Sequence, residues 1–158
     1  MSDWNLPWTG GCRCSTTRIA ISKAPLLTMA CHCMGCQRMS ASAFSLSIAV
    51  PADGFEVIAG SPILGGLNRD MHFFCPQCLS WMFTRPIGLD WFVNVRVPVL
   101  DDHHWVEPFV ETNTAEKLAW ASTPAKHSFA RVPELSSYED LVHEFRIEGK
   151  RPPPSIVP

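Results

Sequence analysis

The placement of cysteine is the feature that most constrains how this 158-residue chain can fold. Its seven cysteines all fall in three clusters: Cys12 and Cys14 (C-x-C), Cys31, Cys33 and Cys36 (C-x-C-x-x-C), and Cys75 and Cys78 (C-x-x-C). An odd number of cysteines fits poorly with a closed set of disulfides. In a reducing compartment, clustered thiols are more typical of metal ligands or catalytic groups. We therefore expect a scaffold that brings these clusters together around metal.

Composition narrows the class of protein. The net charge is −2 and 18% of residues are charged, which disfavours a nucleic-acid-binding protein. The apolar runs are far shorter than the roughly 20 residues needed to span a bilayer, and residues 1–8 lack the pattern of a secretory signal. We expect a cytoplasmic protein without membrane or nucleic-acid partners. The sequence does not distinguish a monomer from a homodimer.

Short strands joined by turns are predicted for most of the chain. The sequence contains 14 prolines and 9 glycines, and residues 44–50 alternate between apolar and small residues with a period of two. The predicted strands cover residues 16–21, 26–33, 44–50, 55–58, 71–74, 81–84, 91–97 and 103–106. Between them, residues 37–42 are small and polar and are predicted to form a loop.

The C-terminal part of the chain differs from the rest. Residues 138–147 place Tyr138, Leu141, Val142 and Phe145 at helical spacing, which predicts one amphipathic helix. Residues 116–121 are expected to form a short helix or a turn. We divide the chain into a lead-in (1–9) with Trp4 and Trp8 as anchors, a zinc-binding β domain (10–121), and an extension (122–158) with this helix and a proline-rich tail.

Counting ligands separates two kinds of metal site. Four thiolates in a tetrahedron suit Zn²⁺. The pair Cys12 and Cys14 with the pair Cys75 and Cys78 makes a closed structural site that would clip the N-terminal strand to a central hairpin. An alternative is that Cys31, Cys33 and Cys36 contribute to the closed site, leaving another pair as redox thiols.

The three remaining cysteines predict an open site. On an extended backbone Cys31 and Cys33 project to one face and His32 to the other, while Cys36 can fold back after Gly35. Three ligands with one vacancy is the pattern of a catalytic zinc, and a site with three thiolates suits an incoming thiol better than water. Its negative charge could be offset by Arg13, Arg38 or Arg69.

Other residues with chemical potential have simpler interpretations. The tryptophans on predicted strands, Trp81, Trp91 and Trp105, are expected in the core, with a substrate-lining role for one of them as the alternative. The histidines outside the clusters are expected on the surface or in packing roles: His72, His103, His104, His127 and His143. Arg38 is expected to be a solvated charge, with anion binding as the alternative.

These motifs resemble the glutathione-dependent formaldehyde-activating enzyme family, which shares a domain with centromere protein V. The resemblance covers residues 10–14, 31–44 and 74–78 and extends over about residues 10–121. It implies a mainly β, Mss4-like fold of antiparallel sheets. It also implies two zinc ions per chain, a structural one at Cys12, Cys14, Cys75 and Cys78, and a second, open to partial occupancy, at catalytic Cys31, Cys33 and Cys36. The implied activity is that of a carbon–sulfur lyase, which adds a small thiol such as glutathione to an aldehyde such as formaldehyde.

The chain departs from the family pattern near each cluster. Ser15 and Leu79 stand where the family usually has glycine after a cysteine pair, so a different turn is expected at Leu79. Ser40 and Ala41 replace the Gly-Ser that follows the three-cysteine motif, which leaves the substrate open. Two alternatives to the enzyme are a non-catalytic zinc-stabilised module that binds a thiol or a protein, and a redox role for Cys33 and Cys36.

Overall fold

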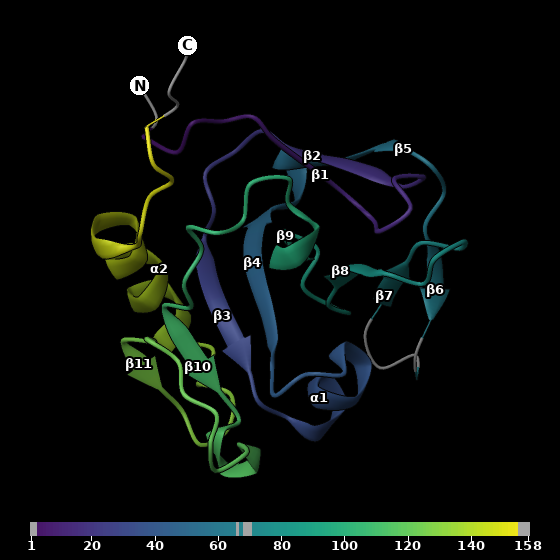
Figure 1. Cartoon of the computed structure of the whole chain (residues 1–158). Helices are drawn as coiled ribbons and strands as arrows, with labels where there is room; N and C mark the ends of the chain where they lie inside the picture. The colour runs from purple at the N-terminus through teal and green to yellow at the C-terminus, as the bar shows by residue number, and fades with distance from the viewer. Residues whose placement is uncertain (1–2, 66, 68–70, 155–158) are drawn as a thin grey trace.

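The computed structural model describes residues 3–65, 67 and 71–154, and it is mainly β. A three-stranded sheet has the order β1-β2-β5, formed by Trp8–Gly11, Arg18–Ile21 and Phe55–Ala59. An eight-stranded sheet has the order β11-β10-β3-β4-β9-β8-β7-β6 (Figure 1). Its strands in chain order are β3 Leu27–Cys31, β4 Ser45–Pro51, β6 Ile63–Gly65, β7 Met71–Phe74, β8 Trp81–Arg85, β9 Phe92–Arg96, β10 Val110–Thr112 and β11 His127–Ser128.

Most strand pairs are antiparallel, as the sequence predicts, but one edge of the large sheet is parallel. There β10 pairs parallel with both β3 and β11. The predicted strand at residues 103–106 is wrong, because that segment forms turns and the chain enters the sheet only at Val110. Its apolar residues Trp105 and Val106 are buried all the same. Burial of apolar side chains therefore does not require strand pairing here.

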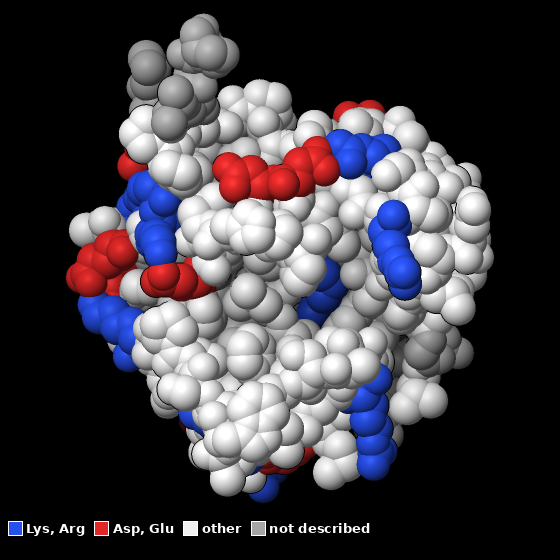
Figure 2. Space-filling model, in the orientation of Figure 1, with Lys and Arg blue, Asp and Glu red and all other residues white. Residues whose placement is uncertain are grey.

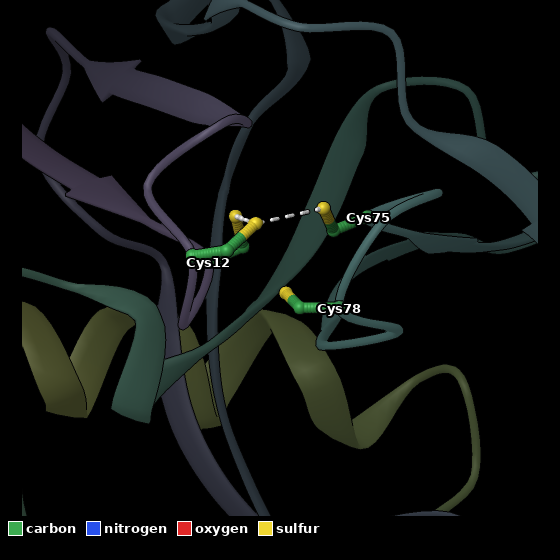
Figure 3. Close-up of side chains that lie close together, drawn as sticks. Cys12, Cys75 and Cys78 are labelled. Carbon is green, nitrogen blue, oxygen red and sulfur yellow. Dashed lines mark hydrogen bonds between the residues drawn. The ribbon is translucent and has the colours of Figure 1, made fainter.

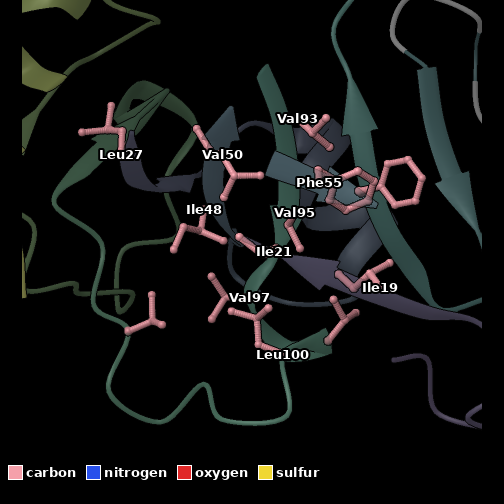
Figure 4. Close-up of a cluster of buried hydrophobic side chains, with 14 of the residues drawn as sticks. Ile19, Ile21, Leu27, Ile48, Val50, Phe55, Val93, Val95, Val97 and Leu100 are labelled. Atoms are coloured by element: carbon pink, nitrogen blue, oxygen red, sulfur yellow. The ribbon is translucent and has the colours of Figure 1, made fainter. Parts of the chain in front are cut away.

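The core lies where the two sheets pack together (Figure 4). On β4, the alternation directs Ile48 and Val50 into this core, where they meet Val93 and Val95 of β9, and all four side chains are fully buried. The residues that alternate with them along β4, Ser45, Ser47 and Ala49, face the other side of the sheet. This second face carries the functional residues described below.

The helical elements differ from or refine the sequence-based expectation. The predicted loop at 37–42 is wrong, because helix α1 spans Met34–Ser40. The C-terminal helix is confirmed as α2, Ser137–Glu148, which lies beside β3, β10 and β11 (Figure 1). Short 3₁₀ turns occupy Ala52–Gly54, Val97–Val99 and Thr114–Glu116.

Aromatic stacking ties both ends of the described chain to the core. Trp4 is 5% exposed, and its ring stacks on Phe145 of α2 with the centroids 5.6 Å apart. Phe145 also meets Phe109 edge-to-face at 5.4 Å. Trp105 is buried as expected, whereas the expectation for Trp91 is wrong, since it is 58% exposed. No helix within the described residues is both long and apolar enough to traverse a bilayer.

Candidate metal centres

Four cysteines from two distant parts of the chain converge in the first cluster. Cys12 and Cys14 lie in the turn between β1 and β2, and Cys75 and Cys78 lie in the turn between β7 and β8. Their sulfur atoms all lie within 4.8 Å of one another, and Figure 3 shows Cys12, Cys75 and Cys78 pointing toward a common centre. This convergence excludes the alternative in which Cys31, Cys33 and Cys36 complete the closed site.

The spacing of the sulfurs fits a tetrahedral metal ion. The Sγ atoms of Cys12 and Cys14 are 3.5 Å apart, and those of Cys14 and Cys75 are 3.8 Å apart. Sulfurs about 2.3 Å from a central zinc would be separated by roughly 3.8 Å. Without a cation the thiols divide their protons unequally: hydrogen bonds from Ser80 lower the pKa of Cys78 to about 5, while burial raises the pKa of Cys12. A divalent cation would favour the thiolate form of all four.

The turns around this cluster keep left-handed backbone without glycine. Ser15 has φ = 63° and Leu79 has φ = 58°. The expected change of turn at Leu79 is therefore wrong. The reason lies in the hydrogen bonds of the turn: the Ser15 N–H donates to the carbonyl of Cys12, and the Leu79 N–H donates to the carbonyl of Cys75, both at 3.0 Å. The side chain of Leu79 is 67% exposed, so the left-handed conformation costs strain but no clash with the core.

The second cluster is built at the junction of β3 and α1. The Sγ atoms of Cys31, Cys33 and Cys36 lie within 4.8 Å of one another. Cys33 is the N-cap of α1, and its sulfur accepts the N–H of Cys36 at 3.3 Å. This cap explains the helix that the sequence did not predict: the thiol that serves as a candidate ligand also satisfies the first turn.

Three sulfurs are the full protein contribution to this second cluster among the described residues, since no His, Asp, Glu or fourth Cys joins them. The side-chain amide of Asn113 donates to Cys31 Sγ at 3.3 Å. A hydrogen bond from Cys36 lowers the pKa of Cys31 to about 5, and the same bond raises the pKa of Cys36. The cluster cannot easily hold three thiolates alone, so it too suits a bound cation.

His32 turns away from the sulfurs, which confirms the prediction from strand geometry. Its ring is fully buried, and Nε2 lies 2.9 Å from Oε2 of Glu111. Burial raises the pKa of Glu111, but hydrogen bonds from Ser128, Thr123 and His32 and the charge of Lys117 outweigh it and lower the pKa to about 2. The ionised carboxylate can only accept, so Nε2 carries the donated proton.

Glu111 lies on β10, whose register with β3 places Thr112 beside Cys31. The backbone N–H of His32 donates to the carbonyl of Thr112 at 3.0 Å. The Glu111–His32 pair thus restrains the segment that carries the three cysteines, on the side opposite their sulfurs. Sequence reasoning missed Glu111, because it is one acidic residue among many and its role depends on the parallel β3–β10 pairing.

The basic residues expected beside the second cluster are not the ones found there. Arg13 and Arg38 are exposed, and Arg69 lies outside the described residues. Instead Arg96, at the end of β9 and 8% exposed, lies near the cluster: burial lowers its pKa to about 10, and the charges of Cys36 and Cys31 partly oppose that effect. The other histidines do not join either cysteine cluster within the described part of the chain.

Comparison with known proteins places the chain in a family, and the arrangement of its cysteines is consistent with that family. The family model described as glutathione-dependent formaldehyde-activating enzyme matches residues 7–116, and the chain belongs to this family. The match ends before β11 and α2, so the C-terminal segment is outside it.

A solved structure of a Rhodobacter sphaeroides protein, a structural genomics target, is similar at 19% identity with a TM-score of 0.48. The similarity covers 59% of this chain and 87% of that one. The search of curated proteins found no match to this chain.

Proposed function

We propose that this chain is a zinc-dependent carbon–sulfur lyase that adds a small thiol to a small aldehyde at Cys31, Cys33 and Cys36. The observation that carries the proposal is an incomplete ligand set: three sulfurs converge within 4.8 Å, and no fourth protein ligand is found among the described residues. Membership of the formaldehyde-activating family supports glutathione as the thiol and formaldehyde as the aldehyde.

The proposed reaction joins the two substrates without any oxidation or reduction. The thiol gives up its proton, its sulfur forms a bond to the carbonyl carbon, and the carbonyl oxygen takes a proton to become a hydroxyl. Cys31, Cys33 and Cys36 would hold a zinc ion, which would offer an open position and lower the pKa of a thiol bound there. The protein then contributes chiefly by holding the reacting groups in position.

The chain's own residues fix the geometry of the three sulfurs. The Cys33 cap on α1 and the Asn113 contact with Cys31 each restrain one sulfur. Gln37 adds a further restraint, because its side-chain amide donates to the carbonyl of His32 at 2.7 Å and to that of Glu116 at 3.0 Å. We assign a structural role to the other site, Cys12, Cys14, Cys75 and Cys78, which joins the two sheets.

Two serine substitutions test this division of labour. Cys33→Ser should remove activity and lower the zinc content from two to one per chain while the far-ultraviolet circular dichroism stays unchanged. Cys78→Ser should prevent stable folding, because structural zinc contributes about 10–16 kcal/mol in small domains and whole domains are stable by only about 5–15 kcal/mol.

The measurements are metal analysis, circular dichroism and formation of the thiol–aldehyde adduct with glutathione and formaldehyde. Equal loss of stability in both variants would refute the separate roles. Wild-type protein that holds two zinc ions and binds the thiol without turnover would instead support a non-catalytic thiol-binding module.

A further inference from the structure

Arg96 is a buried cation on the same sheet face as Cys31. Cys31 pairs with Ser45 on β4, and Ser47 pairs with Arg96 on β9. Residues directly opposite one another, and residues two apart on a strand, share a face of the sheet. The register therefore places Arg96 and Cys31 on one face, separated by β4.

The guanidinium of Arg96 has unused hydrogen-bonding capacity. It lies 4.0 Å from the centre of the Trp81 ring, and its Nη2 makes only long contacts of 3.4 Å to Thr84 Oγ1 and the carbonyl of Asn94. Its Nε is buried and has no partner. No carboxylate of the described residues lies within 4.0 Å of Arg96, whereas Arg18 pairs with Asp101 and Arg151 with Asp3. The charges of Cys36 and Cys31 lie near Arg96, but its hydrogen-bond donors remain largely unused and are available to a ligand.

Arg96 borders a cavity of about 870 Å³. Two other residues that line the cavity carry buried donors: the Trp81 indole N–H has no partner, and the Ser45 hydroxyl lies beside the Cys36 thiol. Each of the three groups can donate a hydrogen bond. Figure 2 shows a hollow in the middle of this face of the molecule, with basic atoms inside it and mainly uncharged residues around it.

The charge of the cavity lining favours an anion. Its basic residues are Arg13 and Arg96, and the acidic residue Asp101 is already paired with Arg18 at 2.5 Å. The volume lies within the range of about 300–1,000 Å³ that is usual for small-molecule sites.

The cavity lies beside the three-cysteine cluster, although the cysteine in its lining is Cys12 of the four-cysteine cluster. Ser40 lines the cavity and donates its hydroxyl to the carbonyl of Cys36 at 2.7 Å, and Ser45 is the strand partner of Cys31. Ser40 and Ser45 thus separate the cavity from Cys36 and Cys31 by a single residue contact each.

We infer that this cavity binds a carboxylate group of the substrate, and that Arg96 is the residue that recognises it, with Ser45 and Trp81 as further donors. The planar fork of a guanidinium matches the two oxygens of a carboxylate. The inference rests on the proposed function, since it names the substrate class of the same site: a small thiol that carries a carboxylate a short distance from its sulfur. The competing explanation is that Arg96 only offsets the negative charge of the thiolates.

Two matched thiols distinguish these explanations. 3-Mercaptopropionate and 3-mercapto-1-propanol have the same carbon chain, and only the first is an anion. Their dissociation constants are measured by titration calorimetry with the zinc-loaded wild type, Arg96→Met, Arg96→Lys and Arg38→Met, a control in which an exposed arginine of α1 is removed. Propionate is added as a probe without a thiol.

We expect the wild type and Arg38→Met to bind the anionic thiol about 10- to 100-fold more tightly than the neutral one, since charge-assisted hydrogen bonds have about that effect. The preference should fall at least 10-fold in Arg96→Met. Arg96→Lys, which keeps the buried charge and guards against a folding defect in Arg96→Met, should retain only part of it. Equal binding of both thiols by the wild type would overturn the inference.

Loss of zinc without loss of the preference in Arg96→Met would also overturn it, because Arg96 would then act only on the charge of the cluster. If neither thiol binds but propionate binds in an Arg96-dependent way, the carboxylate site stands and the proposed thiol chemistry fails. The failure of one proposal is thus separable from the failure of the other.

Discussion

Replacing Glu111 by Gln tests whether the buried pair behind the cysteine loop stabilises the protein. Glutamine keeps the shape of the side chain but removes the charge that accepts from Ser128, Thr123 and His32. The carboxylate has its pKa lowered from 4.5 to about 2. A shift of that size corresponds to about 3 kcal/mol of stabilisation at neutral pH, and the amide oxygen should recover part of it. We expect Glu111→Gln to lower the free energy of unfolding by about 2–3 kcal/mol.

The pH dependence follows from the sign of the shift. A carboxyl group with a lowered pKa in the folded state stabilises the protein at pH values above its unfolded pKa of 4.5, and the contribution is lost as the pH falls toward 2. The difference between wild type and Glu111→Gln should therefore be constant from pH 5 to 8 and shrink below pH 4.5. Both proteins lose thiolate ligands in acid, so the difference between them isolates Glu111.

Urea denaturation of zinc-loaded protein across this pH range measures the effect. Glu134→Gln is the matched control, because Glu134 is exposed, and it should change the free energy of unfolding by less than about 0.5 kcal/mol. A loss below 0.5 kcal/mol for Glu111→Gln, or a difference that stays constant down to pH 3, would refute the reasoning.

Two further substitutions test the turn at Leu79 and the packing of α2. Leu79→Gly should stabilise the protein by about 1 kcal/mol and raise the melting temperature by about 2–4 °C in thermal unfolding. The reason is that glycine adopts the left-handed conformation without strain, and the Leu79 side chain buries little surface. The control Ile87→Gly, at an exposed turn position, should not stabilise the protein. A lower melting temperature for Leu79→Gly would contradict the assignment of strain. Phe145→Ala should lower the free energy of unfolding by about 3–5 kcal/mol in urea denaturation, because Phe145 is 1% exposed and packs on Trp4 and Phe109. Ile147→Ala is the control, because Ile147 is 68% exposed. Similar losses in both variants would show that α2 contributes no specific packing.

Local patterns were sufficient to predict much of this fold. The alternation at residues 44–50 identified β4, and the helical spacing from Tyr138 to Phe145 identified α2. Each periodicity arises because one face of a single strand or helix packs on the core, so the pattern is visible in consecutive residues. The helix at Met34–Ser40 escaped prediction because its stabilising cap is a cysteine sulfur, which ordinary capping preferences do not include.

The partition of the cysteines was also predictable, because four ligands close a tetrahedron and three leave it open. Strand geometry correctly turned His32 away from the sulfurs, since neighbours on an extended backbone face opposite sides. The partner of His32 was beyond this reasoning. Glu111 meets it through a parallel pairing between segments about 80 positions apart, and nothing local in either segment specifies that register.

Arg96 shows the same limit and explains why it matters for function. In the sequence it lies within the predicted strand at 91–97, and Arg13, Arg38 and Arg69 were the arginines expected to offset the charge of the thiolates. Two strand registers across β4 bring Arg96 to the face that carries Cys31. Because Arg96 lies on a central strand and is buried, its charge is held rigidly and shielded from water. The charge of an exposed arginine on α1 would be screened by solvent. For that reason the substrate preference of this protein should depend on Arg96 rather than on the basic residues within the cysteine motifs.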